Sequence, residues 1–272
     1  MRHRFATLCA VLLLAGCSWA PHSRHYRSNL VDYLYPHGVR DAPRAARLQL
    51  PLRVGLAFVP AAPSPVDQVA EQRLLDIVRK AFTGRPWVGE IRTIPSHYLE
   101  IEGGYENLEQ VASLMDVDVI ALVSVDQIQY NDPTALSILY ISVVGQYLLP
   151  GDRNDTRTLI DVAVVDVGSR HFLLRAPGTS HLTGFATPID GERKLRNKSD
   201  EGLRRAMLDL TKNLDTEVGN FKSSVVAGER ADVDIVTKEG KSLRGGGAID
   251  GPTAVMLLII AGAVLLGRRK GA

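Results

Sequence analysis

Cysteine is scarce in this chain, which has two such residues, Cys9 and Cys17, among 272. Cys9 falls inside an apolar stretch that we expect to be removed as an export signal. The mature chain would then keep only Cys17, so no disulfide could form within it. Its stability must therefore come from an ordinary hydrophobic core.

The common catalytic and nucleotide-binding signatures are missing as well. The sequence has no G-x-S-x-G elbow, no H-E-x-x-H, no Walker loop and no dinucleotide fingerprint after a strand. Gly103-Gly104 opens a helix without the further glycines of a phosphate cradle, so we interpret this pair as a turn. The sequence therefore predicts no catalytic residue and no cofactor.

The remaining polar candidates are scattered. Three histidines of the central region share no metal-ligand spacing and are expected at the surface: His97, His171 and His181. Neither of two aspartate pairs is expected to bring its carboxylates together as an acid–base couple. Asp116 and Asp118 flank the start of a strand, and Asp161 and Asp166 lie on opposite faces of a strand. The oxygen-rich loop of Asp152, Asn154 and Asp155 misses the EF-hand spacing, so we predict no metal site. An enzyme assembled from residues such as His171 or Asp166 is kept as an alternative.

The stretch from Met1 to Gly16 has the three parts of an export signal. Arg2 and Arg4 precede an apolar stretch that is too short to span a bilayer, and small residues follow it. The sequence Leu14-Ala15-Gly16-Cys17 resembles a bacterial lipobox, which is cut between Gly16 and Cys17 by lipoprotein-processing enzymes. The resemblance implies that Cys17 carries a diacylglycerol, with fatty acids such as palmitate. Ser18 replaces the Asp often found in inner-membrane lipoproteins, which implies the outer membrane as the destination.

The C-terminal run from Thr253 to Leu266 contains no charged residue. As a helix it would be about 21 Å long, shorter than the hydrocarbon core of about 30 Å. Extending it back to Ala248 adds an Asp-Gly-Pro sequence, so we expect the outer end to unwind easily. Three basic residues should stay cytoplasmic and place the preceding chain in the periplasm: Arg268, Arg269 and Lys270.

Three glycines, Gly245, Gly246 and Gly247, stand before this segment. Together with the Asp-Gly-Pro sequence, the short apolar helix and the basic end, they resemble the GlyGly-CTERM sorting signal. That signal is cleaved by rhombosortase, a rhomboid-type intramembrane serine protease of Gram-negative bacteria. With the lipobox, the whole pattern resembles the rhombotarget lipoprotein family. The resemblance implies that cleavage near the glycines removes a second anchor that would otherwise hold the lipoprotein in the inner membrane.

A chain without both terminal signals would run from Cys17 to about Gly246. That length suits one ordinary domain with tethers, or two small ones. The two removed pieces carry a net charge of +2 each, so the formal net charge would change from +2 to −2. The charge therefore gives no support for nucleic-acid binding.

The middle of the sequence has the periodicities of an α/β (α+β) domain. Strands are predicted over residues 50–60, 87–95, 116–130, 137–150, 156–167 and 170–177. Helices are predicted over residues 64–84, 106–115 and about 199–222, the first with Ser64 as its N-cap. The order β-α-β-α-β-β-β-α indicates a mixed β-sheet covered by about three helices. Part of this pattern resembles the small domains of envelope assembly lipoproteins, such as the TolB N-terminal and curli-secretion types.

The regions around this domain are predicted to be less regular. The amphipathic piece Ser28–Pro36 could dock on the domain, touch headgroups or contact a partner, and docking is favoured. The charged run Gly191–Arg205 is interpreted as a solvated loop and helix start, and residues 232–240 as a short extra strand. The chain is thus divided into a signal peptide (1–16), a lipidated tether (17–47), the α/β domain (48–222), a linker with the glycine-rich recognition site (223–247) and a transmembrane sorting signal (248–272).

The sequence therefore predicts an envelope lipoprotein whose domain is a non-enzymatic interaction or assembly module. Its expected partners are the membrane, the processing enzymes, the rhomboid-type protease and an envelope protein, with no nucleic acid. The precursor would sit in the inner membrane facing the periplasm, and the mature form at the outer membrane or the surface. The alternative to cleavage is a permanent, doubly anchored inner-membrane scaffold.

Overall fold

The computed structural model describes residues 22–38, 44–64, 66–133, 152–186, 191–238, 240 and 242–243. The residues predicted to direct lipidation and sorting lie outside these ranges: Gly16, Cys17, Gly245 to Gly247, and Thr253 to Lys270. The predicted strand over residues 137–150 also lies outside them. Among the helices of the described residues, none is both long and apolar enough to cross a membrane.

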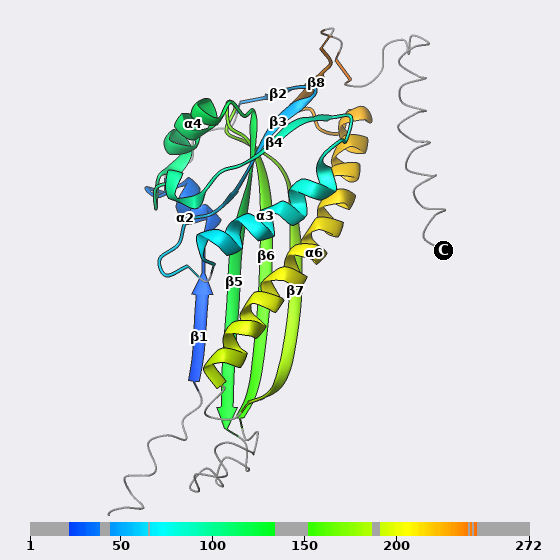
Figure 1. Cartoon of the computed structure of the whole chain (residues 1–272). Coiled ribbons are helices and arrows are strands. Elements are labelled where there is room, and N and C mark those ends of the chain that lie inside the picture. The colour runs from blue at the N-terminus through cyan, green and yellow to red at the C-terminus, as the bar shows by residue number, and fades with distance from the viewer. Residues whose placement is uncertain are drawn as a thin grey trace, which may run out of the picture.

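A mixed six-stranded sheet forms the centre of the domain (Figure 1). Its order is β4-β3-β5-β6-β7, and β1 pairs with β5. The strands are β1 (His22–Arg27), β3 (Leu52–Phe58), β4 (Val88–Thr93), β5 (Val119–Pro133), β6 (Asp152–Asp166) and β7 (His171–Ala186). Strand β3 is parallel to both neighbours, whereas β5, β6 and β7 form an antiparallel meander. The predicted mixed α/β sheet is confirmed.

Helices cover both faces of the sheet around β3 (Figure 1). Helices α3 (Gln68–Phe82) and α6 (Gly191–Val226) pack on one face, and α2 (Leu30–Leu34) and α4 (Gly104–Met115) on the other. Along β3, Leu56 and Phe58 belong to the first cluster, whereas Ala57 and the next residue after the strand, Val59, belong to the second. This alternation follows from the period of two along a strand.

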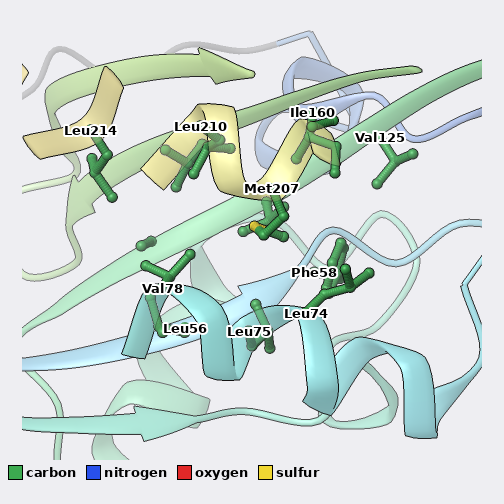
Figure 2. Packing of buried hydrophobic residues seen from close by; sticks show 14 of the residues in the cluster. Leu56, Phe58, Leu74, Leu75, Val78, Val125, Ile160, Met207, Leu210 and Leu214 are labelled. Atoms are coloured by element: carbon green, nitrogen blue, oxygen red, sulfur yellow. The ribbon is translucent and has the colours of Figure 1, made fainter. Parts of the chain in front are cut away.

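The largest hydrophobic cluster lies between α3, α6 and the sheet. Figure 2 shows Met207 of α6 in its middle, above Leu75 and Val78 of α3. Met207 and Leu210 are completely buried. The apolar stripe predicted along this part of α6 is therefore confirmed, and it supplies much of the hydrophobic stabilisation of the fold.

Before Leu203, α6 contacts the sheet largely through polar groups. The helix begins at Gly191, so the predicted helix start in this charged run is confirmed, whereas the predicted loop before about Ser199 is wrong. The Gln127 side chain donates to Thr158 Oγ1 at 2.8 Å and to the Ser199 carbonyl at 3.2 Å. Gln127 and Thr158 are buried. Because polar residues make this contact, the apolar helical period that marks the rest of α6 is missing here.

The segment predicted to be a tether is largely packed on the domain in its described residues. Strand β1 pairs antiparallel with the second half of β5, from Arg27 opposite Asp126 to His22 opposite Asn131. Helix α2 follows, and its Tyr33 is buried in the cluster under α4. The predicted docking of Ser28–Pro36 is thus confirmed, while the tether interpretation fails for β1 because the backbone ladder holds a polar strand.

One helix start also differs from the prediction. Helix α3 has Asp67 as its N-cap, and its carboxylate accepts a hydrogen bond of 2.8 Å from the Ala70 amide. Ser64, the predicted cap, instead accepts a bond of 3.2 Å from the Val66 amide. A carboxylate at the N-cap also interacts favourably with the positive end of the helix dipole, so Asp67 is the stronger start signal.

Candidate functional site: an apolar cavity

A cavity of about 480 Å³ lies between the sheet, α3, the C-terminal half of α6 and a small two-stranded sheet. That sheet consists of β2 (Ala46–Gln49) and β8 (Val233–Val236), which are parallel. Apolar side chains make up nearly all of the cavity lining, and the exceptions are two lysines and one threonine. In size and character it matches a site for a small apolar molecule.

Each side of the cavity comes from a different element. The floor comes from strands β3, β5 and β6: Leu52, Val54, Leu56, Val119, Ala121 and Val164. The walls come from α3, β4 and α6: Val78, Phe82, Trp87, Ile91, Leu214, Val218 and Phe221. The two-stranded sheet of β2 and β8 forms the roof of the cavity and contributes Leu48 and Ile235 to its lining.

The cavity lies between two hydrophobic clusters whose side chains do not fill the space between them. One cluster lies under α3 and α6, and the other contains β2, β8 and Leu173. Val54 and Val164 pack against both clusters yet remain only partly buried. Trp87 and Ile91 are also partly exposed. Since protein interiors are normally close-packed, a concave apolar surface left open here is consistent with a binding site.

The roof is built from two segments that lie far apart in the chain. Ala46–Gln49 lies in the predicted tether, and Val233–Val236 lies in the predicted linker, so neither segment is a simple spacer. The amide of Leu50 donates to the Val236 carbonyl at 2.9 Å, and that of Leu243 donates to the Ile235 carbonyl at 2.7 Å. The predicted extra strand within residues 232–240 is confirmed as β8.

A polar cluster fastens the roof to β7. The Asp232 carboxylate accepts a hydrogen bond from Arg230 at 2.9 Å and lies 2.6 Å from His171 Nε2. The Arg230 guanidinium donates to the Leu173 carbonyl at 3.1 Å and stands over the Phe221 ring. The hydrogen bonds from Arg230 hold the pKa of Asp232 far below its usual value. His171, a candidate for a scattered enzyme site, therefore takes part in a structural link.

Three polar residues line the cavity. Lys222 lies on α6, and Thr237 and Lys238 follow β8. Burial lowers the pKa of Lys222. The hydroxyl oxygen of Thr237 is buried and has no hydrogen-bond partner among the described residues. All three residues belong to the roof or to the helix beneath it, whereas the floor is apolar.

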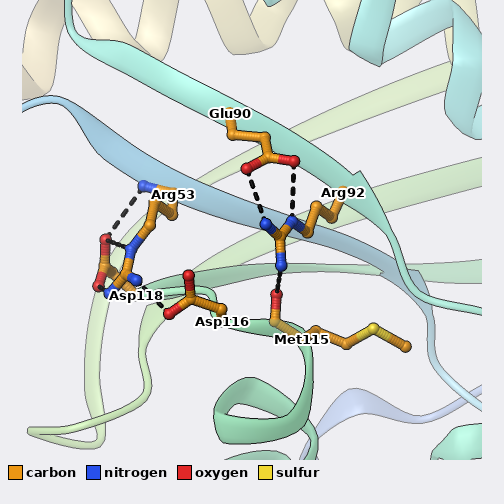
Figure 3. A network of polar contacts seen from close by, with 6 residues as sticks. All are labelled: Arg53, Glu90, Arg92, Met115, Asp116 and Asp118. Carbon is orange, nitrogen blue, oxygen red and sulfur yellow. Dashed lines mark hydrogen bonds and ion pairs between the residues drawn. The ribbon is translucent and has the colours of Figure 1, made fainter.

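The predicted aspartate pair Asp116 and Asp118 does not form an acid–base couple. Figure 3 shows both carboxylates turned to Arg53 at the start of β3. Asp118 accepts from the Arg53 amide at 3.1 Å and from its Nε at 3.0 Å. Burial alone would raise the pKa of Asp118, but the bonds from Arg53 outweigh it and lower that pKa. The arrangement is an ion-pair network that joins the end of α4 to the sheet.

A second part of this network joins β4 to the end of α4. The Arg92 guanidinium forms two bonds of 2.9 Å with the Glu90 carboxylate and a further bond with the Met115 carbonyl (Figure 3). These groups are largely exposed, so their contribution to stability is modest. Their role is to fix the position of α4 relative to β4.

A smaller hollow of about 380 Å³ lies next to this network. Its acidic residues already have partners. Asp118 is bound by Arg53, Glu109 pairs with Arg170 at 2.9 Å, and Asp166 accepts from the Ser169 amide at 3.2 Å. A general base needs a carboxylate that can reach a substrate proton. This hollow is therefore the weaker candidate for a functional site.

Two other predicted polar candidates, Asp161 and His181, take part in pairs on the sheet. Asp161 is bound by Arg175 at 2.8 Å, and His181 lies 3.0 Å from Asp155. His97 stacks on Tyr98, outside both hollows. These pairs connect neighbouring positions of the fold and converge on no common point. Within the described ranges, no group of three His, Cys, Asp or Glu residues could hold a metal ion.

The predicted oxygen-rich loop is not a loop. Asp152, Asn154 and Asp155 lie within strand β6. Asn154 is fully buried whereas Asp155 pairs with His181 and Arg157, because consecutive residues of a strand point to opposite faces. The side-chain oxygens of Asn154 and Asp155 therefore do not face a common point.

The sequence did not predict the cavity. Its lining uses the same apolar residue types as a filled core, so periodicity predicts burial at these positions without predicting a hollow. Its polar residues Thr237 and Lys238 fall in a segment predicted to be a linker. The one usable signal was the apolar alternation in residues 232–240, which indicated that this segment contains a strand.

Comparisons with known proteins give distant likenesses. No protein-family model matches the chain, and no curated protein sequence matches it. One similar structure is a PelC dodecamer from Paraburkholderia phytofirmans, 10% identical over 71% of this chain and 98% of that chain, with a TM-score of 0.25. A DUF330 protein from Xanthomonas campestris is 12% identical over 68% and 95%, with a TM-score of 0.34.

A third similar structure is a neuraminyllactose-binding hemagglutinin homologue from Helicobacter pylori. It is 8% identical over 67% of this chain and 96% of that chain, with a TM-score of 0.35. With TM-scores below 0.5, these likenesses assign no function to the chain. Its function has to be inferred from its own residues.

Proposed function

We propose that this chain is a lipoprotein of the Gram-negative cell envelope whose domain is a non-enzymatic binding module for an apolar molecule. The observation that carries the proposal is the cavity under the β2–β8 roof, which is almost entirely apolar and partly open. Binding sites for small ligands have this composition, with a few polar groups that fix orientation. The interaction module predicted from the sequence would thus act on an apolar ligand.

The arrangement of the polar residues supports binding over catalysis. Asp118, Asp166 and His171 each contact a neighbouring side chain that fixes the fold. Among the described residues, those that line the cavity include no acid and no histidine. Acid–base catalysis requires a positioned group that can exchange a proton with the substrate. A cavity that is apolar except for two lysines and one threonine is suited to binding an apolar molecule.

The location is proposed from the terminal sequences. Lipidation at Cys17 would anchor the N-terminus, and cleavage near Gly245, Gly246 and Gly247 would release the basic C-terminal segment. Strand β1 begins at His22, shortly after the proposed lipidation site, and His22 lies opposite Asn131, whereas the cavity uses Val119 and Ala121 at the other end of β5. The lipid would therefore hold the domain at a membrane by the end of the sheet that is distant from the cavity. A permanent double anchor is the alternative.

Labelling in the native envelope tests the binding function. Cells of the native host would be fed a fatty alcohol that carries a photoreactive diazirine, and the crosslinked chain would be digested and mapped by mass spectrometry. We expect labels on cavity residues such as Val164 and Ile91. The variant Val164→Trp places a large ring on the cavity floor and should abolish these labels.

The matched control is Leu114→Trp, which adds the same ring at an exposed position of α4 outside the cavity. It should leave the labels in place. Labels confined to the surface of the domain, or labels that persist at cavity residues in Val164→Trp, would contradict the proposal. Circular dichroism of both variants checks that the fold is retained.

A further inference from the structure

We propose that the molecule bound in the cavity is a single-chain amphiphile with an anionic head, a fatty acid in the simplest case. Its chain would lie on the apolar floor, and its carboxylate would be bound at the roof by Lys222 and Thr237, with Lys238 adding positive charge. This inference rests on the proposed function, and it adds the chemical class of the ligand.

Lys222 provides the first argument. It lies on α6 next to Phe221 and lines the cavity, partly buried among apolar residues. In the described part of the chain it has neither a hydrogen-bond acceptor nor a carboxylate partner. Burial of the unpaired ammonium lowers its pKa, which means that the charged form is poorly solvated there. An anionic head would supply the missing partner and form a charge-assisted hydrogen bond.

Thr237 provides a second, independent argument. Its hydroxyl oxygen is buried without a hydrogen-bond partner among the described residues. A buried polar group without a partner costs free energy, and most such groups in native proteins are satisfied by protein, water or ligand. A carboxylate oxygen would accept a hydrogen bond from this hydroxyl. An ordered water molecule is the competing explanation.

The distribution of charged residues around the cavity indicates how the ligand is oriented and which charge its head carries. Lys222 lies three residues before Val225, which packs in one cluster with Val233 and Ile235 of β8. The lysine is therefore on the roof side, like Thr237 and the exposed Lys238. No acidic residue of the described chain lines the cavity. A cationic head would meet two positive charges, and an uncharged head would leave the Lys222 ammonium without an anionic partner.

Trp87 makes the inference measurable. The chain has two tryptophans, and Trp87 lines the cavity. In the full chain carrying Trp19→Phe and held in nanodiscs of uncharged lipid, Trp87 would be the sole tryptophan. A brominated fatty acid should quench its fluorescence, because bromine quenches at short range. The fatty alcohol of the same length should need about a tenfold higher concentration, the effect of losing one charge-assisted contact.

Substitutions then identify the residues that bind the head. Lys222→Met should raise about tenfold the concentration of fatty acid that is needed to quench Trp87, and leave the concentration of the alcohol unchanged. Lys222→Arg should retain most of the preference for the acid over the alcohol. Thr237→Val should weaken binding of the fatty acid several-fold. Lys212→Met, at an exposed position of α6 outside the cavity, should have no effect on binding.

The possible results separate the two proposals. Equal quenching by acid and alcohol would overturn the anionic head and leave apolar binding in place, and absence of quenching by both would overturn both. An unchanged acid preference in Lys222→Met, with folding verified by circular dichroism, would overturn the role of this lysine. An unchanged acid affinity in Thr237→Val would mean that water, not the head, satisfies Thr237.

Discussion

Gly178 of β7 lies directly under Ala206 of α6. A Cβ atom built on Gly178 would overlap the carbonyl oxygen of Ala206 and the backbone amide of Leu210. Real Cβ atoms do not approach backbone atoms so closely, so the contact between helix and strand depends on the missing side chain. This contact fixes α6 over the sheet and thereby positions the wall of the cavity.

Gly178→Ala should therefore destabilise the domain by about 2 kcal/mol or more, because the helix must move away from the strand. Urea unfolding of the full chain in nanodiscs, followed by circular dichroism, measures the change. Gly219→Ala is the matched control, since this glycine of α6 has open space around it. It should stabilise the helix by about 0.5–1 kcal/mol. Equal effects of the two substitutions would contradict the proposed close contact.

Met207→Ala should cost about 2–5 kcal/mol of unfolding free energy. Its side chain is completely buried between α6 and α3, so removal leaves a cavity in the largest cluster (Figure 2). The same urea titration measures the loss. Leu208→Ala, at the next position of the helix and exposed, should change stability by less than about 0.5 kcal/mol. A small loss at Met207 would show that the two helices pack more loosely than described.

The Arg53 network predicts a specific dependence on pH. The pKa of Asp118 is lower in the folded state than in the unfolded state, because Arg53 stabilises the carboxylate. Its contribution to stability is therefore present above the unfolded pKa of about 3.9 and lost as pH falls through the folded pKa. Arg53→Gln should lower stability by about 1 kcal/mol at pH 7, and the difference from wild type should shrink below about pH 4.

Urea unfolding at pH 7, 5, 4 and 3 measures this difference. Arg73→Gln is the control, since Arg73 is exposed on α3 and has no ion-pair partner among the described residues. It should change stability little at each pH. If the difference between Arg53→Gln and wild type stayed constant down to pH 3, Asp118 would not be the titrating partner.

The hydrogen bonds of Arg230 are expected to slow hydrogen exchange in the cavity roof. Its guanidinium binds Asp232 and the Leu173 carbonyl, so Arg230→Met should release β8 from β7. We expect amide hydrogens of Val233–Val236 to exchange about tenfold faster, which corresponds to the loss of about one net hydrogen bond. Hydrogen exchange with mass spectrometry measures the rates. Arg204→Met, which removes an exposed ion pair with Glu201, should leave β8 unchanged.

The sorting proposal predicts the mass of the mature protein. Protein from membranes of the native host should lack the segment before Cys17, carry lipid, and have lost the C-terminal segment that follows the glycines. The C-terminal loss should disappear in a strain without the rhomboid-type protease. A lipidated chain that retains Arg268 to Ala272 in wild-type cells would establish the permanent double anchor instead.

The elements predicted well from the sequence are those that bury one apolar face. The helical spacing of Leu74 and Val78 in α3, and of Met207 and Leu210 in α6, follows from packing on a sheet. The period-two pattern of β6 and β7 likewise reflects the sheet pleat. In these elements the local pattern and the final environment agree, so the prediction succeeds.

The elements missed from the sequence are held by partners distant in the chain. Strand β1 reads His22 to Arg27 without apolar alternation, and it exists because β5 offers an unpaired edge. Strand β2, which lies between β1 and β3 in the sequence, pairs with β8, which follows α6. The part of α6 before Leu203 packs on β5 through Ser199 and Gln127. Backbone pairing and polar packing leave little local pattern, so they become visible only when the partners are placed.

The sequence by itself determined the elements with a strong apolar period and the mixed α/β class, and it carries the terminal motifs on which the lipidation and sorting proposals rest. Only the tertiary structure decided that β2 and β8, far apart in the chain, form a roof, and that Val54 and Val164 beneath it are left partly exposed. The physical reason is that apolar periodicity records the tendency of a side chain to leave water. Whether neighbouring side chains then fill the space is decided by the positions of elements far apart in the chain.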